Sequence, residues 1–224
     1  MSKHSKRGLS LLELTITVAL LGLLLLLIFN SFDMGTRIFQ ETSVRQSTET
    51  QLRSIKVLLQ RDIKLSNFWL CNAVSRPTAD GSRDALSLAT LSNWKDPTLY
   101  DGTTNRPLWN RYTVWYATQG SLGSLHRQVI SPSFSGSALA TAYGDLAANL
   151  SDTDPNSNAD VTFSRVLSEG VRDFEISTRL QNGTIRAKIR LEATGLKRAN
   201  SSDKTKDNLE VSLVFRPKNT WPEI

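Results

Sequence analysis

Hydrophobic residues are most concentrated near the start of the chain, where residues 14–32 form an uncharged run of 19 residues. At about 1.5 Å of rise per residue, a helix of that length spans roughly 29 Å, close to the hydrocarbon thickness of a bilayer. Lys3, Lys6 and Arg7 precede the run. Because basic residues favour the cytoplasmic side, the pattern predicts one transmembrane helix over residues 9–32, with the chain after about Asp33 across the membrane.

The same helix is expected to continue to about residue 70. No proline occurs before Pro77, so nothing in this part of the sequence forces a break. An apolar stripe with the spacing of one helix face appears near its end, at Leu52, Ile55, Leu59 and Ile63. Residues 33–70 are therefore predicted to form an amphipathic continuation that packs on a sheet.

Residues 71–224 are predicted to form a globular domain that contains this sheet. Runs of alternating or β-branched and aromatic residues predict strands at 85–91, 112–118, 125–130, 174–180, 185–191 and 209–215. Asn182-Gly183 is typical of a hairpin turn. Residues 131–160 are dominated by Ser, Ala, Gly, Asn and Asp, and predict a flexible insertion. The expected fold class is α+β, a long helix on an antiparallel sheet with one apolar face.

Composition and charge narrow the range of functions. The chain has 27 Lys and Arg against 21 Asp and Glu, a formal net charge of +6, and three of the basic residues lie in the first eight positions. The remaining excess is small, so no specific nucleic-acid partner is expected. One cysteine and two histidines exclude a disulfide framework, a cysteine zinc site and a CxxC redox motif. We therefore expect no cofactor and no enzymatic activity.

Glu13 is the unusual residue of the apolar helix, because it places an acid one turn inside the run. A charge at membrane depth costs about 2.5–3.5 kcal/mol on insertion scales, and the sequence offers it no partner nearby on the same helix face. A secretory signal peptide would end in a small-residue cleavage site, which residues 30–33 do not provide. A plain signal anchor accounts for the length and the orientation of the run but leaves Glu13 unexplained.

The sequence Gly8-Leu9-Ser10-Leu11-Leu12-Glu13, after a short basic leader, resembles the type IV pilin and type II secretion pseudopilin superfamily. The resemblance implies a pilin-like fold and cleavage after Gly8 by prepilin peptidase, which removes a leader of residues 1–8. Leu9 would become the N-terminus and be N-methylated, although the family most often has phenylalanine there. Glu13 would form an inter-subunit salt bridge with the N-terminal amine of a neighbouring subunit during assembly.

Within the superfamily the chain looks most like a J-type minor pseudopilin, because of Arg61-Asp62 near the helix end, residues 125–127, and residues 167–174 before a hairpin. This implies a structural subunit of a type II secretion pseudopilus in the bacterial inner membrane, with a periplasmic domain. Its partners would be other minor and major pseudopilins or pilins, and prepilin peptidase. A W-type minor pilin of a type IV pilus and a membrane-anchored periplasmic binding module remain alternatives.

Three further patterns allow a functional interpretation. Asp152, Asp154, Asn156, Asn158 and Asp160 alternate as calcium ligands do, but Ser157 and Phe163 replace the glycine and the acid that such a loop needs, so a solvated loop is the simpler expectation. A strand with Arg186, Lys188 and Arg190 could bind an acidic ligand or be a solvated face. The aromatic residues Trp94, Trp109, Tyr112, Trp115 and Tyr116 could stack on sugars, although core packing is the more usual role of such residues.

Overall fold

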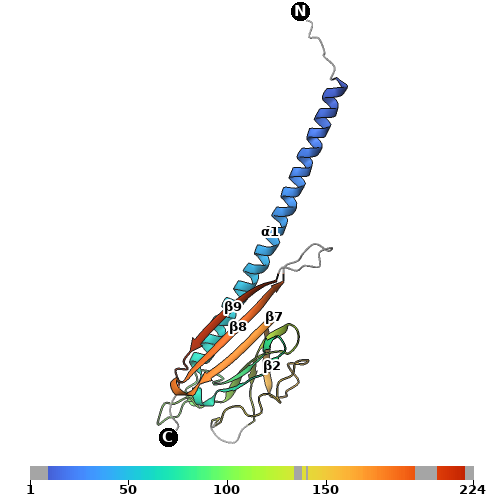
Figure 1. Cartoon of the computed structure of the whole chain (residues 1–224). Coiled ribbons are helices and arrows are strands. Elements are labelled where there is room, and N and C mark those ends of the chain that lie inside the picture. Colours follow the sequence, from blue (N-terminus) through green and yellow to red (C-terminus); the bar gives the residue numbers. More distant parts are fainter. Residues whose placement is uncertain (1–9, 134–137, 140, 195–205, 220–224) are drawn as a thin grey trace, which may run out of the picture.

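The long N-terminal helix is present in the computed structural model, which describes residues 10–133, 138–139, 141–194 and 206–219. Helix α1 spans Leu11–Leu65, 55 residues, with Ser10 as its N-cap and Ser66 as its C-cap. A 3-10 helix, Phe68–Leu70, follows it, so the α-helix ends slightly before the expected residue 70. The N-terminal part of α1 projects away from the domain, and only its C-terminal part lies on the sheet (Figure 1).

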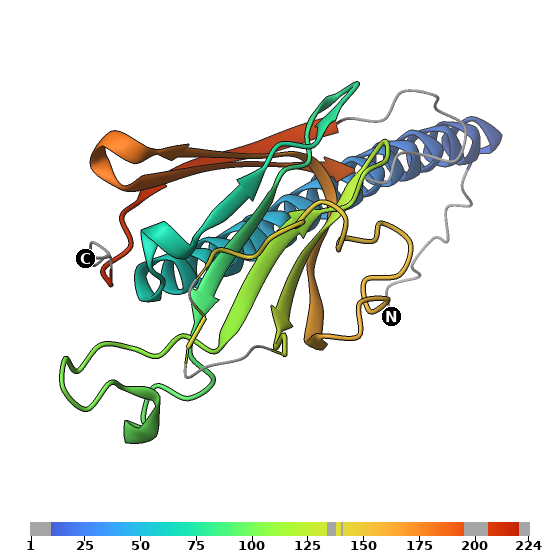
Figure 2. The same ribbon diagram turned by 90° about the horizontal axis from the view of Figure 1, so that it is seen from below.

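Seven antiparallel strands form one sheet in the order β1-β4-β5-β6-β7-β8-β9. Their bounds are β1 Asn72–Val74, β4 Ala85–Thr90, β5 Arg111–Ala117, β6 Gly123–Ile130, β7 Val161–Arg179, β8 Thr184–Thr194 and β9 Lys206–Phe215. The short strands β2 (Pro77–Thr78) and β3 (Gly81–Ser82) pair separately, and two more 3-10 helices span Pro97–Leu99 and Leu180–Asn182. This confirms the expected α+β fold class, and Figure 2 shows the strands curling around the helix.

One hydrophobic core lies between α1 and the sheet. The predicted stripe supplies Ile55, Leu59 and Ile63, which are buried, while Leu52 packs against them from a partly buried position. Alternate residues of the strands complete this core, among them Leu86, Leu88, Trp115, Leu125, Phe174, Ile185, Ile189 and Leu213. The helix therefore holds the domain through its last three turns or so, as the stripe predicted.

A second core lies on the opposite face of the sheet, so the prediction of a single apolar face is wrong. The residues of β4 and β5 that alternate with those of the first core are also buried, because both strands are apolar at odd and even positions. The described residues of segment 131–160 contribute Leu139, Tyr143 and Leu146 to this core. The composition of the segment predicts a flexible insertion and does not identify these core residues.

Gly123, at the start of β6, allows a tight turn after β5. A Cβ there would lie well inside van der Waals contact with the Thr118 carbonyl oxygen and 3.1 Å from Arg83 Nε, whereas Gly144 has no atom within 4 Å of the corresponding position. Because backbone must move to admit the methyl group, Gly123→Ala is expected to lower the free energy of unfolding by about 1–3 kcal/mol.

Chemical denaturation of the full chain in detergent measures this loss directly, with Gly144→Ala as the matched control. The control is expected to change the free energy of unfolding by less than about 0.5 kcal/mol. Equal losses in the two variants would contradict the close packing at Gly123.

Candidate functional site

The start of α1 is closed by a reciprocal cap between Ser10 and Glu13. Ser10 has extended backbone geometry; its Oγ accepts a hydrogen bond from the Glu13 amide at 3.3 Å, and its own amide donates to Glu13 Oε2 at 2.9 Å. Such a capping box satisfies two of the backbone donors that every helix start leaves unpaired. The expectation that Glu13 has no partner nearby is therefore wrong. The S-x-x-E signature at residues 10–13 could have revealed the partner.

The Glu13 carboxylate can still take a further hydrogen-bond donor. An ionised carboxylate offers about four lone-pair sites, and the cap uses Oε2. Gly8 and Leu9, the predicted cleavage and methylation positions, lie outside the described residues. The structure consequently places Glu13 one turn into a helix, engaged with Ser10, without testing the roles predicted for Gly8 and Leu9.

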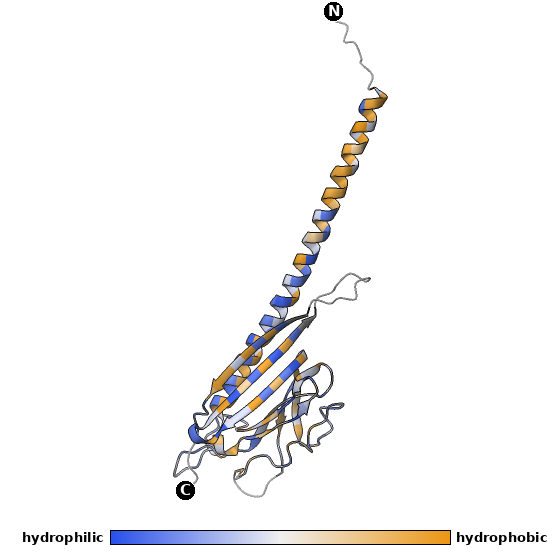
Figure 3. Cartoon of the chain, viewed as in Figure 1, coloured by the Kyte–Doolittle hydropathy of each residue, from blue (hydrophilic) through white to orange (hydrophobic). Residues whose placement is uncertain are grey.

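The apolar half of α1 is not covered by any other described part of the chain. Large hydrophobic side chains from Leu11 to Phe32 are more than half exposed, and the ribbon of Figure 3 is coloured mostly hydrophobic along this projecting part of the helix. By length and composition this section could cross a membrane. An exposed apolar surface of this size is typical of contact with lipid or with other proteins.

The two threonines within the apolar section are satisfied by the helix itself. The Thr15 hydroxyl donates to the carbonyl of Leu12 at 2.9 Å, and that of Thr17 to the carbonyl of Glu13 at 2.7 Å. Internal satisfaction of polar groups is what an environment without water requires. The first ion pair on the helix, Asp33–Arg37 at 2.7 Å, appears where the apolar run ends.

Asp62 joins the last turn of α1 to the sheet. Its Oδ2 accepts hydrogen bonds from Arg127 Nε on β6 at 2.6 Å and from Trp115 Nε1 on β5 at 3.2 Å. The carboxylate is nearly buried, whereas Arg61, which approaches its other oxygen at 3.2 Å, is exposed. This contact fixes the projecting helix relative to the domain. It also brings together residues 61–62 and 125–127, on which part of the pseudopilin resemblance rests.

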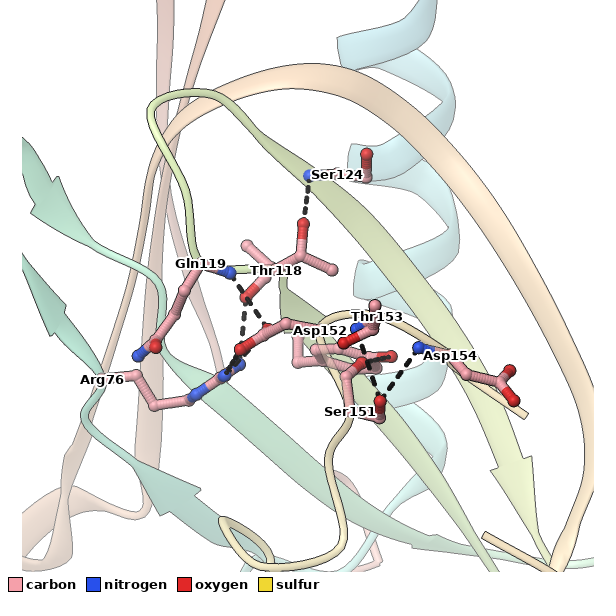
Figure 4. A network of polar contacts seen from close by, with 10 residues as sticks. Arg76, Thr118, Gln119, Ser124, Ser151, Asp152, Thr153 and Asp154 are labelled. Atoms are coloured by element: carbon pink, nitrogen blue, oxygen red, sulfur yellow. Dashed lines mark hydrogen bonds and ion pairs between the residues drawn. The ribbon is translucent and has the colours of Figure 1, made fainter. Parts of the chain in front are cut away.

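The possible calcium loop is held by contacts within the domain (Figure 4). Both carboxylate oxygens of Asp152 accept from Arg76 Nη2, at 2.9 Å and 2.7 Å, and its Oδ1 also accepts from the Gln119 amide at 3.0 Å. Asp154 and Asn158 accept from the amides of Asn156 and Asp160, two residues further on. Among the described residues, no three His, Cys, Asp or Glu side chains are grouped to hold a metal ion. The calcium hypothesis gains no support from this arrangement.

The basic and aromatic patterns have structural explanations. On the outer face of the sheet, Arg190 and Lys188 both face Glu210, at 2.8 Å and 3.7 Å. Trp109, Tyr112, Trp115 and Tyr116 are buried core residues, as the simpler interpretation predicted. Burial raises the pKa of the Cys71 thiol to about 12, so Cys71 is not a thiolate near neutral pH.

His126 on β6 is expected to make the stability of the domain depend on pH. It is buried, stacks on Tyr116 with ring centroids 5.1 Å apart, and its Nδ1 has no hydrogen-bond partner among the described residues. Burial lowers the pKa of His126, and the nearby Asp152 opposes this only in part. The unfolded chain, with a histidine pKa of about 6.5, therefore binds a proton more readily than the folded one.

We expect the free energy of unfolding to fall as the pH drops below about 6.5, with His126 contributing at most about 1.4 kcal/mol per pH unit. Urea denaturation of the full chain between pH 7.5 and pH 5.5, the range that brackets that value of about 6.5, measures the slope. His126→Gln is expected to flatten the slope, since the carboxylates are common to both proteins. Parallel pH profiles for the two proteins would contradict the contribution of His126.

Comparison with known proteins gives a distant structural similarity. No protein-family model matches the chain, and no curated protein sequence matches it. A type IV-like pilin from Thermus thermophilus is similar in structure, with a TM-score of 0.39 and 10% sequence identity, over 77% of this chain and 97% of that chain. A similarity of this size does not establish a shared family or function.

Proposed function

We propose that this protein is a prepilin-type subunit that enters a filament through its N-terminal helix. The observation that carries the proposal is the acid at Glu13, one turn into an apolar helix that no described part of the fold covers. Such a residue within the membrane is usually functional and usually has a charged partner. The Gly8-Leu9 motif next to it accounts for such a partner, because cleavage after Gly8 would create a new, positively charged amine at Leu9 of a neighbouring subunit.

The Glu13 carboxylate would have a hydrogen-bond or charge partner both before and after the subunit enters the filament. In the inserted monomer the Ser10 amide occupies Oε2. An α-amine has a reference pKa of about 7.7–8.0 and is mostly cationic near neutral pH, so the amine of a neighbouring subunit can pair with the same carboxylate in the filament. In a low-dielectric interior, leaving one of two such charges unpaired costs about 3–5 kcal/mol. Entry into the filament thus depends on the charge of Glu13.

More narrowly, we propose a minor pseudopilin of a type II secretion system, closest to the J type. The chain would be inserted in the bacterial inner membrane with residues 1–8 on the cytoplasmic side until prepilin peptidase removes them. The domain would lie in the periplasm and join other pseudopilins in a short filament. It would perform no catalysis itself. The Asp62–Arg127 contact supports a structural role, because it sets the direction of the filament helix relative to the domain.

Deletion of the coding sequence in its native host, with complementation, tests this function. The pseudopilin proposal predicts that secreted proteins accumulate in the periplasm while surface pili are retained. Loss of surface pili with normal secretion would instead assign the chain to a type IV pilus. If both secretion and piliation remained normal, the filament role would be contradicted and an anchored binding module would be the remaining interpretation.

A further inference from the structure

Strand β9 is a long, unprotected edge of the sheet. All ten of its residues pair with β8 on one side without a register shift, from Ile185↔Phe215 to Thr194↔Lys206. No strand of the described chain pairs with its other side, and the strand contains no proline or bulge. The opposite edge, β1, has only three residues. An open edge of this length presents a row of backbone donors and acceptors that can pair with another chain.

A groove runs beside this edge, between β9 and α1. It has a volume of about 340 Å³ and an apolar floor made by Leu52 of the helix and by Leu209 and Val211 of the strand. These strand residues belong to the set that faces the helix, because they alternate with the exposed Glu210 and Ser212. Side chains of an added strand that point the same way would therefore enter the groove.

The charges around the groove are not balanced. Glu49 is paired with Arg45 at 3.3 Å, and Glu210 with Arg190 at 2.8 Å. Arg53 and Lys56 also line the groove, and neither has an ion pair in the part of the chain that the structure describes. The groove therefore offers two unpaired cations beside an apolar floor, which favours a partner that carries carboxylates.

The direction of β9 excludes a second copy pairing through the same edge in antiparallel fashion. Leu209 and Val211 lie beside residues 49–56 of α1, and the Lys218 amide, just after β9, donates to the Lys64 carbonyl at 3.1 Å. The strand thus runs in the same direction as the helix, as Figure 1 also shows. An antiparallel pair of β9 strands would point the two α1 helices in opposite directions, which one membrane insertion orientation does not allow.

We propose that β9 and its groove bind an extended, acidic segment of a different protein chain, which adds to the sheet as a further strand. Backbone hydrogen bonds to β9 provide affinity, alternate apolar side chains fill the groove, and carboxylates pair with Arg53 and Lys56. This interaction goes beyond the proposed function and uses only the domain and the last turns of α1; it rests on the proposed function in one respect, the membrane orientation of α1 that disfavours a second copy.

A synthetic peptide provides the test, with the full-length protein held in lipid nanodiscs. The probe is about ten residues long, the length of β9, alternates valine with threonine and carries two glutamates; its counterpart carries two lysines. Of the two peptides, we expect only the acidic one to bind, as measured by fluorescence anisotropy. Its binding is expected to slow hydrogen exchange of residues 206–215. The double variant Arg53→Glu/Lys56→Glu is expected to bind it about tenfold more weakly, because two exposed ion pairs are lost.

Arg186→Glu on β8 is the matched control, since it changes an exposed cation outside the groove. It is expected to bind the acidic peptide as the unchanged protein does. Absence of binding, equal binding of the two peptides, or an equal loss in the control would overturn the proposal. Protection of residues 206–215 that needs no peptide and grows with protein concentration would overturn it in favour of a second copy.

Discussion

Glu13→Gln is expected to remain inserted in the membrane and to be cleaved, yet to fail to enter filaments. Glutamine at this position can still accept a hydrogen bond from the Ser10 amide, because capping boxes use Glu or Gln alike. The substitution therefore removes the charge and keeps the cap. The incoming amine is left without its counter-charge, at a cost of about 3–5 kcal/mol, which corresponds to a loss of more than about a hundredfold in incorporation. Incorporation is measured as the fraction of the protein that co-purifies with sheared or cross-linked filaments.

Ser10→Ala provides the complementary variant. It keeps the Glu13 charge and removes the hydroxyl that accepts from the Glu13 amide. Loss of an N-cap side chain costs about 1 kcal/mol of helix stability, so incorporation is expected to fall far less than in Glu13→Gln. Should Glu13→Gln assemble like the unchanged protein while Ser10→Ala fails, the acid would act through its cap and the charge-pairing mechanism would be wrong.

Asp62→Ala is expected to produce the largest loss of domain stability, about 3–5 kcal/mol. The substitution leaves the Arg127 guanidinium nearly buried without its counter-charge, and it leaves the Trp115 indole N–H without its acceptor. Asp62→Asn keeps an acceptor for one of these donors, so its loss is expected to be smaller. The free energy of unfolding is measured by chemical denaturation with tryptophan fluorescence as one of the signals.

Arg61→Ala is the control for Asp62, because it removes the exposed partner of the same carboxylate. Exposed ion pairs contribute about 0–1 kcal/mol, and the control is expected to stay within that range. If Asp62→Ala and Arg61→Ala were equally mild, Asp62 would not be the residue that fixes the helix on the sheet.

The first core could be predicted from the sequence because its residues follow one simple periodicity. Ile55, Leu59 and Ile63 repeat at helical spacing, and the runs around residues 185–191 and 209–215 alternate. The hairpin turn at Gly183 was also predictable, since this residue adopts a left-handed conformation with φ of 59°, which glycine tolerates without strain.

The second core could not be read from alternation, because a strand buried on both faces does not alternate. Residues 114–117 are apolar at consecutive positions and the whole run 112–117 is buried, which is the signal of burial on both faces. Tyr143 and Leu146 lie in a segment with no helical or strand periodicity, so periodicity cannot identify them as core residues; tertiary contacts bury them. The first half of β7 was missed for a related reason, since residues 161–170 mix polar and apolar residues and end at Gly170.

The candidate site was predictable as a motif but not as a contact. The motif at residues 8–13 and the apolar run led to the hypothesis that Glu13 acts in assembly. The hydrogen bond between Glu13 and the Ser10 amide follows from a different pattern in the same six residues, the capping box. Asp62 was noted together with Arg61, yet its partners Trp115 and Arg127 lie on strands far along the chain. Pairing across such separations depends on strand register, which local sequence does not specify.

Mass spectrometry of the N-terminus of the protein isolated from its native membrane tests the central claim most directly. The prepilin interpretation predicts a chain that begins at Leu9 and carries one added methyl group on its amine. A chain that still begins at Met1 would contradict it, because Glu13 would then have no newly formed amine to meet in a neighbouring subunit.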